Sequence, residues 1–277
     1  VFDAICHSFS TVSTGGFSTH DASMAYWNST PIDIIATVFM LIGGISFALH
    51  FAVWRGKSLL AYMRDPECRF FLGLMLLYML MVGGGLLVFG VHEAPGEATR
   101  HAAFQVASFG TGTGLTSTNA AAWPGFIPLL LVFTSFIGGC AGSTAAGMKV
   151  VRAALVFRHS IRELRRLIYP NGVFALRFGK HVVNDRVLQA VWGFVGVYIT
   201  LSVIFTLLFT TTGMDLTTAV SAVAASINNL GVGIGQVGGG FANITDSAKW
   251  MMTILMVAGR LEIFTLLVLF TPMFWKQ

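Results

Sequence analysis

Charged residues are scarce in this chain of 277 residues, of which Asp, Glu, Lys and Arg together make up only 10%. Soluble domains carry about 25% charged residues, so this shortage excludes an ordinary water-soluble fold. It also argues against nucleic-acid binding, because basic residues that contact phosphates need a soluble scaffold to present them. Hydrophobic residues make up 55% of the chain and the mean hydropathy is +0.75, which predicts a protein embedded in a membrane.

Cysteine is also rare, and Cys6, Cys68 and Cys140 are isolated along the chain. Their spacing excludes a disulfide framework and a cysteine metal site, so we interpret them as small apolar side chains. The apolar segments lack paired Asp or His residues, which argues against an intramembrane enzyme. Four histidines lack the spacing of metal ligands and are interpreted as lying at the membrane edges: His92, His101, His159 and His181.

Long apolar runs, by contrast, are abundant. A helix of about 20 apolar residues crosses the hydrocarbon core of a bilayer. The sequence predicts such spans at 31–54, 70–91, 187–212 and 248–275, with a fifth between 126 and 157. Each carries few or no charges, which core helices of a soluble protein seldom do over this length.

Lys and Arg gather in two of the connections between these spans, at 55–69 and at 149–186. Short connections rich in Lys and Arg stay on the cytoplasmic side of a membrane, so both are predicted to face the cytoplasm. The formal net charge of +5 and the pI near 9.4 therefore reflect topology. We also expect the 149–186 segment to help dock a soluble regulator.

An internal repeat is the most informative feature of the sequence. Three segments align when each is anchored on one glycine: 7–17, 105–115 and 222–232, with the anchors at Gly16, Gly114 and Gly231. In each, a stretch too short to span leads into Gly, Thr, Ser and Asn residues, and a polar stretch and a long apolar run follow. This period predicts a repeated unit of helix, re-entrant loop and helix.

Loops at membrane depth are tolerated only where they line a watery cavity or are buried in protein. In a pore, their carbonyl oxygens replace the hydration shell of an ion, and glycine permits the positive φ angles that aim successive carbonyls together. Each lead-in helix points its C-terminal, negative end at the loop, which favours cations. The predicted filter residues are Val12, Ser13, Thr14, Gly15 and Gly16, then Gly110, Thr111, Gly112, Thr113 and Gly114, then Ile227, Asn228, Asn229, Leu230 and Gly231.

A pore on a symmetry axis needs loops around its whole circumference, and four is the usual number for dehydrated potassium. The sequence shows three, and it opens on Val1, inside a repeat. We therefore expect the chain to be a fragment, preceded by an outer helix and one further helix–loop–helix unit.

The segments 7–20 (HSFSTVSTGGFSTH), 108–119 (SFGTGTGLTSTN) and 226–235 (SINNLGVGIG) resemble the second, third and fourth filter loops of the Trk/Ktr/HKT cation-transport superfamily. The resemblance is closest to bacterial TrkH-type potassium uptake subunits. It implies an all-α integral membrane protein with four pseudo-symmetric M1–P-loop–M2 units around a central pore. Residues 1–66 would then end the second unit, 67–186 form the third and 187–277 form the fourth.

The same resemblance implies several functional properties. The permeant ion would be K⁺, and the protein would be a multi-pass homodimer in the lipid of the bacterial inner membrane. A cytosolic, nucleotide-binding regulatory subunit of the TrkA type would dock on its cytoplasmic face, and no nucleic acid would bind. In this superfamily the first filter loop bears on the choice between sodium and potassium. That loop is not in this sequence, while glycine at the three visible anchors favours potassium.

A run of small residues, IGGCAGSTAAG at 137–147, interrupts the fifth span. Such residues let helices pack closely, or they mark an unwound segment that gates the pore beneath the filter. The resemblance favours the second interpretation. The predicted gate residues are Gly138, Gly139, Cys140, Ala141, Gly142, Ser143, Thr144 and Gly147, together with Arg260.

Arg260 falls near the centre of the predicted span 248–275, where a charge costs roughly 2.5–3.5 kcal/mol. Glu262 lies only two positions away and so points to another helix face, which makes it a poor partner. One interpretation is a structural Arg that donates to loop carbonyls. The other, which the resemblance supports, is an electrostatic barrier in the pore below the filter.

An ion-coupled secondary transporter, with K⁺/H⁺ or Na⁺ coupling, is the alternative to a pore. Transporters also contain repeats and broken helices, but the breaks fall within spanning helices at corresponding positions. Here the polar loops fall between the predicted helices, and only the region around Gly138 reads as a true break. The sequence therefore favours a gated potassium pore.

The predicted topology gives a direct test. A single cysteine that replaces Arg165 should not react with an impermeant thiol reagent added outside intact cells, because the basic segment faces the cytoplasm. A cysteine that replaces Asp21, on the predicted outer side, serves as the control and should react. Labelling of the Arg165 position from outside would overturn the topology.

Overall fold

The computed structural model describes residues 1–92, 94–179 and 181–275, and almost all of its regular structure is helical. The α-helices are α1 Phe2–Val12, α2 Thr30–Gly43, α3 Phe47–Gly56, α4 Leu60–Arg64, α5 Pro66–Val88, α6 Pro95–Thr111, α7 Ile127–Ile137, α8 Val150–Ile168, α9 Asp185–Thr211, α10 Leu216–Ile227, α11 Asp246–Arg260, α12 Phe264–Leu269 and α13 Pro272–Trp275. Short 3₁₀ turns are η1 Ser23–Tyr26, η2 Ala120–Ala122 and η3 Gly235–Val237, and β1 Arg177–Phe178 pairs with β2 His181–Val182 in a small antiparallel hairpin. The expected all-α architecture is confirmed.

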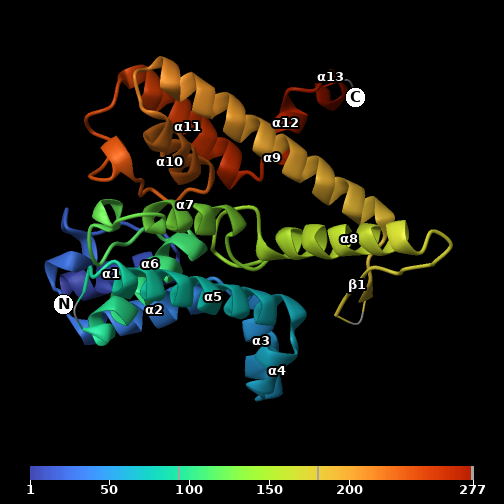
Figure 1. The fold of residues 1–277 in the computed structure, drawn as a ribbon, viewed down its shortest axis with the longest axis horizontal. Coiled ribbons are helices and arrows are strands. Elements are labelled where there is room, and N and C mark those ends of the chain that lie inside the picture. The colour runs from blue at the N-terminus through green and yellow to red at the C-terminus, as the bar shows by residue number, and fades with distance from the viewer. Residues whose placement is uncertain (93, 180, 276–277) are drawn as a thin grey trace.

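The helices form a repeated unit. In α5–α6–α7, and again in α9–α10–α11, the middle helix packs against the helices before and after it (Figure 1). The first helices, α1 and α2, pack on each other in the same way, and α2 also packs on α6 of the next unit. The three repeats inferred from the glycine anchors are therefore three structural units, of which the first lacks a preceding long helix in this chain.

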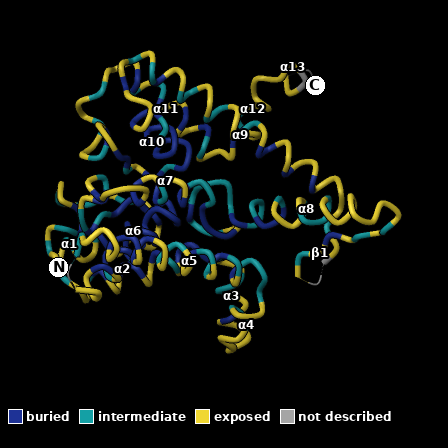
Figure 2. Tube along the Cα trace, viewed as in Figure 1, coloured by how far each residue is buried: buried dark blue, intermediate teal, exposed yellow. Residues whose placement is uncertain are grey.

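Two helices match the predicted spans closely. α5 has 23 residues and α9 has 27, with mean hydropathies of 2.3 and 2.1 in their most apolar windows. Their outward faces carry exposed Leu76, Leu80, Val203 and Leu207, while dark, buried segments gather around α6, α7 and α10 (Figure 2). An apolar exterior is stable only in hydrocarbon, so the chain is a membrane protein.

The other predicted spans are broken. The 31–54 segment is α2 and α3, which meet at an angle of 96°, and α3 leaves the body of the molecule beside the start of α5 (Figure 1). Gly44 sits at the bend, where a Cβ would lie 2.8 Å from Phe71 and 2.9 Å from Thr111. The bend therefore follows from close packing of α2 on α5 and α6.

The last span is broken as well. Helix α11 ends at Arg260, and helix α12 starts at Phe264. Between them, Glu262 and Ile263 take positive φ angles of 56° and 47°. The expectation that only the region around Gly138 breaks a helix was wrong. All three helices that follow a filter loop are interrupted, which a hydropathy profile does not reveal because the residues at the breaks remain mostly apolar.

A buried ion pair joins two units near the outer end of α2. Asp33 is 2% exposed, and its Oδ2 accepts from Nε of Arg100 in α6 at 2.7 Å. Nη2 of Arg100 also donates to Oδ1 of Asn28 at 2.9 Å. This pair fixes the short helix α6 against α2, and it connects residues far apart in the sequence.

Replacing Asp33 should destabilise the protein strongly. Asp33→Asn keeps the side-chain shape but leaves the Arg100 charge without its counter-ion, and breaking a buried pair costs about 3–5 kcal/mol. The thermal unfolding midpoint in detergent should therefore fall. Asp21→Asn, at an exposed position, is the control and should leave the midpoint unchanged. Equal midpoints for both variants would show that the pair does not hold the units together.

Candidate ion-conduction site

Three loops with the same backbone conformation follow the short helices α1, α6 and α10. In each loop the anchor glycine and the residue two positions before it take positive φ. These angles are 51° at Thr14 and 71° at Gly16, 70° at Gly112 and 82° at Gly114, and 50° at Asn229 and 76° at Gly231. Alternation of right- and left-handed residues turns successive carbonyls to the same side of the chain. The repeat read from the sequence is thus also a repeat of backbone geometry.

The same hydrogen bond ties each loop to its helix. The N–H one position before the anchor donates to the carbonyl five residues earlier. The pairs are Gly15 to Ser10 at 2.8 Å, Thr113 to Ser108 at 2.9 Å and Leu230 to Ala225 at 2.8 Å. The carbonyls of Thr113 and Leu230, in contrast, accept no hydrogen bond within the described part of the chain. They remain available to a bound cation.

Side chains of the filter residues bond to the protein behind the loops. Thr111 Oγ1 donates to the carbonyl of Ala107 at 2.7 Å. Asn228 is buried, accepts from the Tyr198 hydroxyl of α9, and donates to Ser135 Oγ of α7 at 3.1 Å. These side-chain hydrogen bonds hold the loops in place, so the free oxygen atoms belong to the backbone and not to the side chains.

Consecutive loops touch at their anchor glycines. A Cβ on Gly16 would lie 2.0 Å from the Thr113 carbonyl oxygen, and a Cβ on Gly114 would lie 2.0 Å from that of Leu230. Only glycine fits at such distances, and positive φ adds a second reason. At Gly231 nothing lies within 4 Å of the same position. The three loops therefore adjoin in chain order around a shared centre, with one side open.

The residues that follow each of the first two anchor glycines are hydrogen-bonded to the preceding short helix. His101 Nδ1 bonds Ser117 Oγ at 3.0 Å, and His7 Nε2 bonds Ser18 Oγ at 2.9 Å. His101 is buried at 7% exposure and supports the loop that follows α6. His92 stacks on it with ring centroids 5.1 Å apart. The side chain of His181 lies outside the described residues.

The predicted gate residues form a loop, 138–149, between α7 and α8. Positive φ angles at Gly138, Gly142 and Gly147 fold it back on itself, and a Cβ on Gly138 would lie 2.0 Å from the Ala146 carbonyl oxygen. The interruption is thus an unwound segment and not a close-packed helix. Its Thr144 Oγ1 donates to the carbonyl of Val12 at 3.2 Å, which places the loop directly against the first filter loop.

The second filter loop also contacts this segment, because a Cβ on Gly112 would lie 3.5 Å from Ala146. Inside the loop, Ser143 Oγ donates to the carbonyl of Cys140 at 2.6 Å, and Lys149 Nζ donates to that of Ala145 at 2.8 Å. The structure therefore brings the predicted gate loop and two of the three predicted filter loops together.

Arg260 lies at the C-terminal end of α11, with its side chain exposed. The adjacent Gly259 packs so closely on the third filter loop that a Cβ there would lie 1.9 Å from the Ile227 carbonyl oxygen. No ion pair of Arg260 is found in the described part of the chain, whereas Glu262 pairs with Arg152 of α8. The expectation that Glu262 does not pair with Arg260 agrees with this arrangement.

The region below the filter is rich in charge. Lys149, at the start of α8, lies within electrostatic range of Arg152, Arg260, Glu262 and Glu67. Lys149 and Glu67 were not singled out from the sequence, because they sit at helix ends, where charges are ordinary. Only the three-dimensional convergence of α5, α8 and α11 shows that they surround the gate loop.

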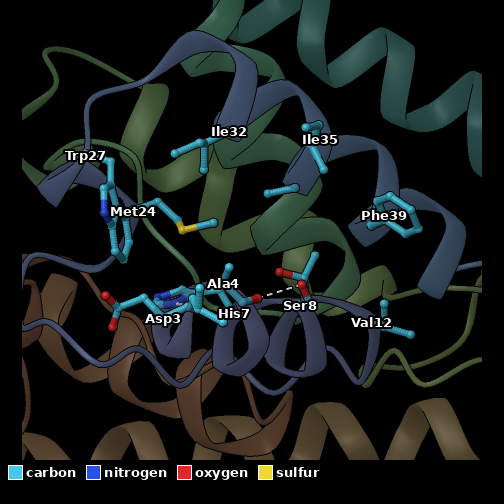
Figure 3. Close-up of a pocket in the computed structure, with 13 residues that line it drawn as sticks. Asp3, Ala4, His7, Ser8, Val12, Met24, Trp27, Ile32, Ile35 and Phe39 are labelled. Carbon is cyan, nitrogen blue, oxygen red and sulfur yellow. Dashed lines mark hydrogen bonds between the residues drawn. The ribbon is translucent and has the colours of Figure 1, made fainter.

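An apolar cavity of about 410 Å³ lies between α1 and α2 (Figure 3). Met24, Trp27 and Phe39 line it, together with His7 and Val12 of α1. None of the anchor glycines does. In the described residues no group of three or more His, Cys, Asp or Glu side chains is placed to hold a metal. The free loop carbonyls are therefore the best candidates for a cation site.

The apolar exterior of α5 and α9 and the short helices that end in glycine-containing loops define a polytopic membrane protein. Comparison with known proteins specifies the class, because residues 1–277 match the family model TrkH, described as "Cation transport protein". The chain belongs to this TrkH family of cation transport proteins.

Individual relatives agree with this assignment. "Trk system potassium uptake protein TrkH" of Salmonella typhimurium is 45% identical over 276 residues, and that of Vibrio parahaemolyticus is 48% identical over 278 residues. In both cases the match covers 100% of this chain and 57% of the relative, so the chain spans a little more than half their length. The crystal structure of the Vibrio parahaemolyticus potassium transporter TrkH superposes with a TM-score of 0.94 at 48% identity, covering 99% of this chain and 59% of that one.

Gly114→Ser should weaken the preference for potassium over sodium by about tenfold, because the added Cβ collides with the Leu230 carbonyl and costs on the order of 1–3 kcal/mol. Competitive uptake of Rb⁺ and Na⁺ into proteoliposomes measures the change. Gly73→Ala, in α5 with open space around it, is the control and should behave as wild type. If Gly114→Ser leaves the preference for potassium over sodium unchanged, the 110–114 loop is not part of the filter.

Proposed function

We propose that this chain forms three sides of a potassium-selective pore for K⁺ uptake across the bacterial cytoplasmic membrane. The observation that carries the proposal is the set of three equivalent loops with alternating φ and free carbonyls. K⁺ sheds its water only if oxygen atoms at fixed positions replace it. The C-terminal ends of α1, α6 and α10 face the loops and add a negative partial charge, so the ion is a cation.

Potassium is the proposed ion for two reasons. The curated relatives are named potassium uptake proteins, and glycine occupies the anchor in all three loops. The open space beside Gly231 matches the expected place of a fourth loop. It lies where the other anchors, Gly16 and Gly114, each meet the carbonyl of a neighbouring loop.

The gate is proposed to consist of the 138–149 loop and Arg260. The loop touches the first two filter loops through Thr144 and Ala146, and Arg260 ends the helix that packs against the third. A cation that leaves the filter would meet a narrow neck of backbone and then a like charge. Displacing the loop would remove the first obstacle, and Arg260 would remain the second.

The surface at the end of α8, on the proposed cytoplasmic side, indicates the proposed partner. Helix α8 ends in the exposed basic residues Arg165 and Arg166 beside exposed Leu164, Leu167 and Ile168. This mixed surface supports docking of a soluble regulatory subunit, which we propose to be the nucleotide-binding, TrkA-like component of the system. Because α8 continues directly from the gate loop, a regulator bound there could move the loop. We also propose that the protein is a homodimer.

An ion-coupled transporter is the second candidate, favoured by one observation. Breaks occur after all three filter loops, at 44–46, 138–149 and 261–263, and corresponding breaks are typical of transporters. The two functions differ in their response to a gradient. Uptake by a transporter coupled to protons would stop when a pH gradient is collapsed, while flux through a pore would continue down the potassium gradient alone.

Arg260→Ala should increase cation flux without a regulator by at least about tenfold, since one elementary charge in a low-dielectric path costs more than 1.4 kcal/mol. The K⁺ over Na⁺ preference should remain, because the filter is unchanged. Flux of Rb⁺ into proteoliposomes checks both. Lys249→Ala, at the other end of α11, is the matched control. If Arg260→Ala folds yet conducts no faster than wild type, the barrier lies elsewhere.

A further inference from the structure

The gate loop is held by contacts from one corner of the molecule, where α2 turns into α3 and where α5 begins. Two backbone hydrogen bonds join the loop to the bend. Cys140 N–H donates to the Gly44 carbonyl at 2.8 Å, and Phe47 N–H donates to the Gly142 carbonyl at 3.0 Å. These bonds fix the loop laterally, but they use only neutral groups.

Glu67 adds a charged contact at the same corner. It lies in the first turn of α5, is partly buried, and its Oε1 accepts from the N–H of Ala141 at 2.6 Å. The backbone of Val151, in the first turn of α8, lies close to this carboxylate. One side chain therefore bonds the gate loop and lies beside the helix that leaves it.

The surroundings strengthen this contact. A hydrogen bond to an ionised acceptor is roughly twice as strong as one between neutral groups, and burial away from water strengthens it further. The N-terminus of α8 contributes a positive partial charge beside the carboxylate. The positive charge of Lys149 and the negative charge of Asp65 also act on it. Val150 N–H donates to the Gly139 carbonyl at 2.9 Å and closes the base of the loop.

We propose that Glu67 is a positioning residue that holds the intramembrane loop closed beneath the filter. This inference rests on the proposed function, because it names how the same gate is regulated. Without the carboxylate, the Ala141 N–H loses its acceptor. The loop then leaves the Val12 carbonyl more often, and the pore opens without a regulator.

Two native cysteines report on the loop and on the corner separately. Cys140 lies in the loop at 1% exposure, and Cys68 lies beside Glu67 in α5 at 0%. With Cys6 replaced by Ser, the rate at which a small uncharged maleimide modifies each thiol in the membrane-embedded protein measures how often each becomes accessible. In Glu67→Ala the Cys140 rate should rise at least tenfold, while the Cys68 rate should stay as in wild type.

Two further variants sharpen the test. Glu67→Gln keeps an acceptor oxygen but loses the charge, so its Cys140 rate should lie between those of wild type and Glu67→Ala. It also keeps the test readable if Glu67→Ala does not reach the membrane. Glu163→Ala is the matched control, since Glu163 lies on α8 and its ion pairs among the described residues are with neighbouring His159, Arg162 and Arg166. Its Cys140 rate should equal that of wild type.

Rb⁺ flux measured on the same proteins should rise in Glu67→Ala in parallel with the Cys140 rate. Thiol labelling does not require ion conduction, so the two measurements test different proposals. If the protein carries no cation, the proposed function is refuted, while the Cys140 rate still tests whether Glu67 holds the loop. An unchanged Cys140 rate in Glu67→Ala overturns the role of Glu67. An equal rise at Cys68 and Cys140 also overturns it, because Glu67 would then support the corner and not the loop.

Discussion

The structure depends on one constraint, which is that backbone N–H and C=O groups in hydrocarbon must find partners. The carbonyls of Thr113 and Leu230 accept no hydrogen bond in the described part of the chain, and in a membrane this is tolerable only where a cation or water replaces the missing donor. Other polar groups of the loops are hydrogen-bonded to the protein behind them. The Gly15, Thr113 and Leu230 N–H groups bond back to their helices, and buried side chains such as Asn228 bond away from the centre.

The same constraint explains why the helices behind the loops are broken. Gly44, Gly139 and Gly259 lie where a helix or loop comes so close to a neighbouring backbone or side chain that a Cβ would not fit. Close approach places a helix end or a gate segment directly against a filter loop. The resulting free N–H and C=O groups pair across units, as in the bond from Cys140 to Gly44, and so the interruptions tie separate units together.

The sequence predicted the parts of this arrangement that depend on local pattern. Glycine anchors, apolar length and the basic connections are all properties of neighbouring residues, and they identified the units, α5, α9 and the unwound segment after Ile137. The breaks after Gly43 and Arg260 were missed because no polar run marks them, and the positive φ angles at Glu262 and Ile263 fall on residue types that do not signal a turn. Contacts between distant segments, such as Asp33 with Arg100 and Glu67 with Ala141, produce no periodic pattern in the sequence. Burial of His101 was missed because a histidine in a short helix is compatible with either environment.

The gate loop differs from the filter loops in what holds it. Each filter loop is bonded to its own preceding helix, so it forms as soon as its unit folds. The 138–149 loop is bonded to the preceding unit through Gly44, Phe47 and the carbonyl of Val12, and to its own unit through Glu67 at the start of α5. Its position therefore depends on how the units sit relative to one another, and a small shift at the α2–α3 corner breaks several of its bonds together. In the described residues the hydrogen bonds that hold the three glycine loops and those that hold the 138–149 loop are separate sets, which meet at the bond from Thr144 to the Val12 carbonyl at the end of α1.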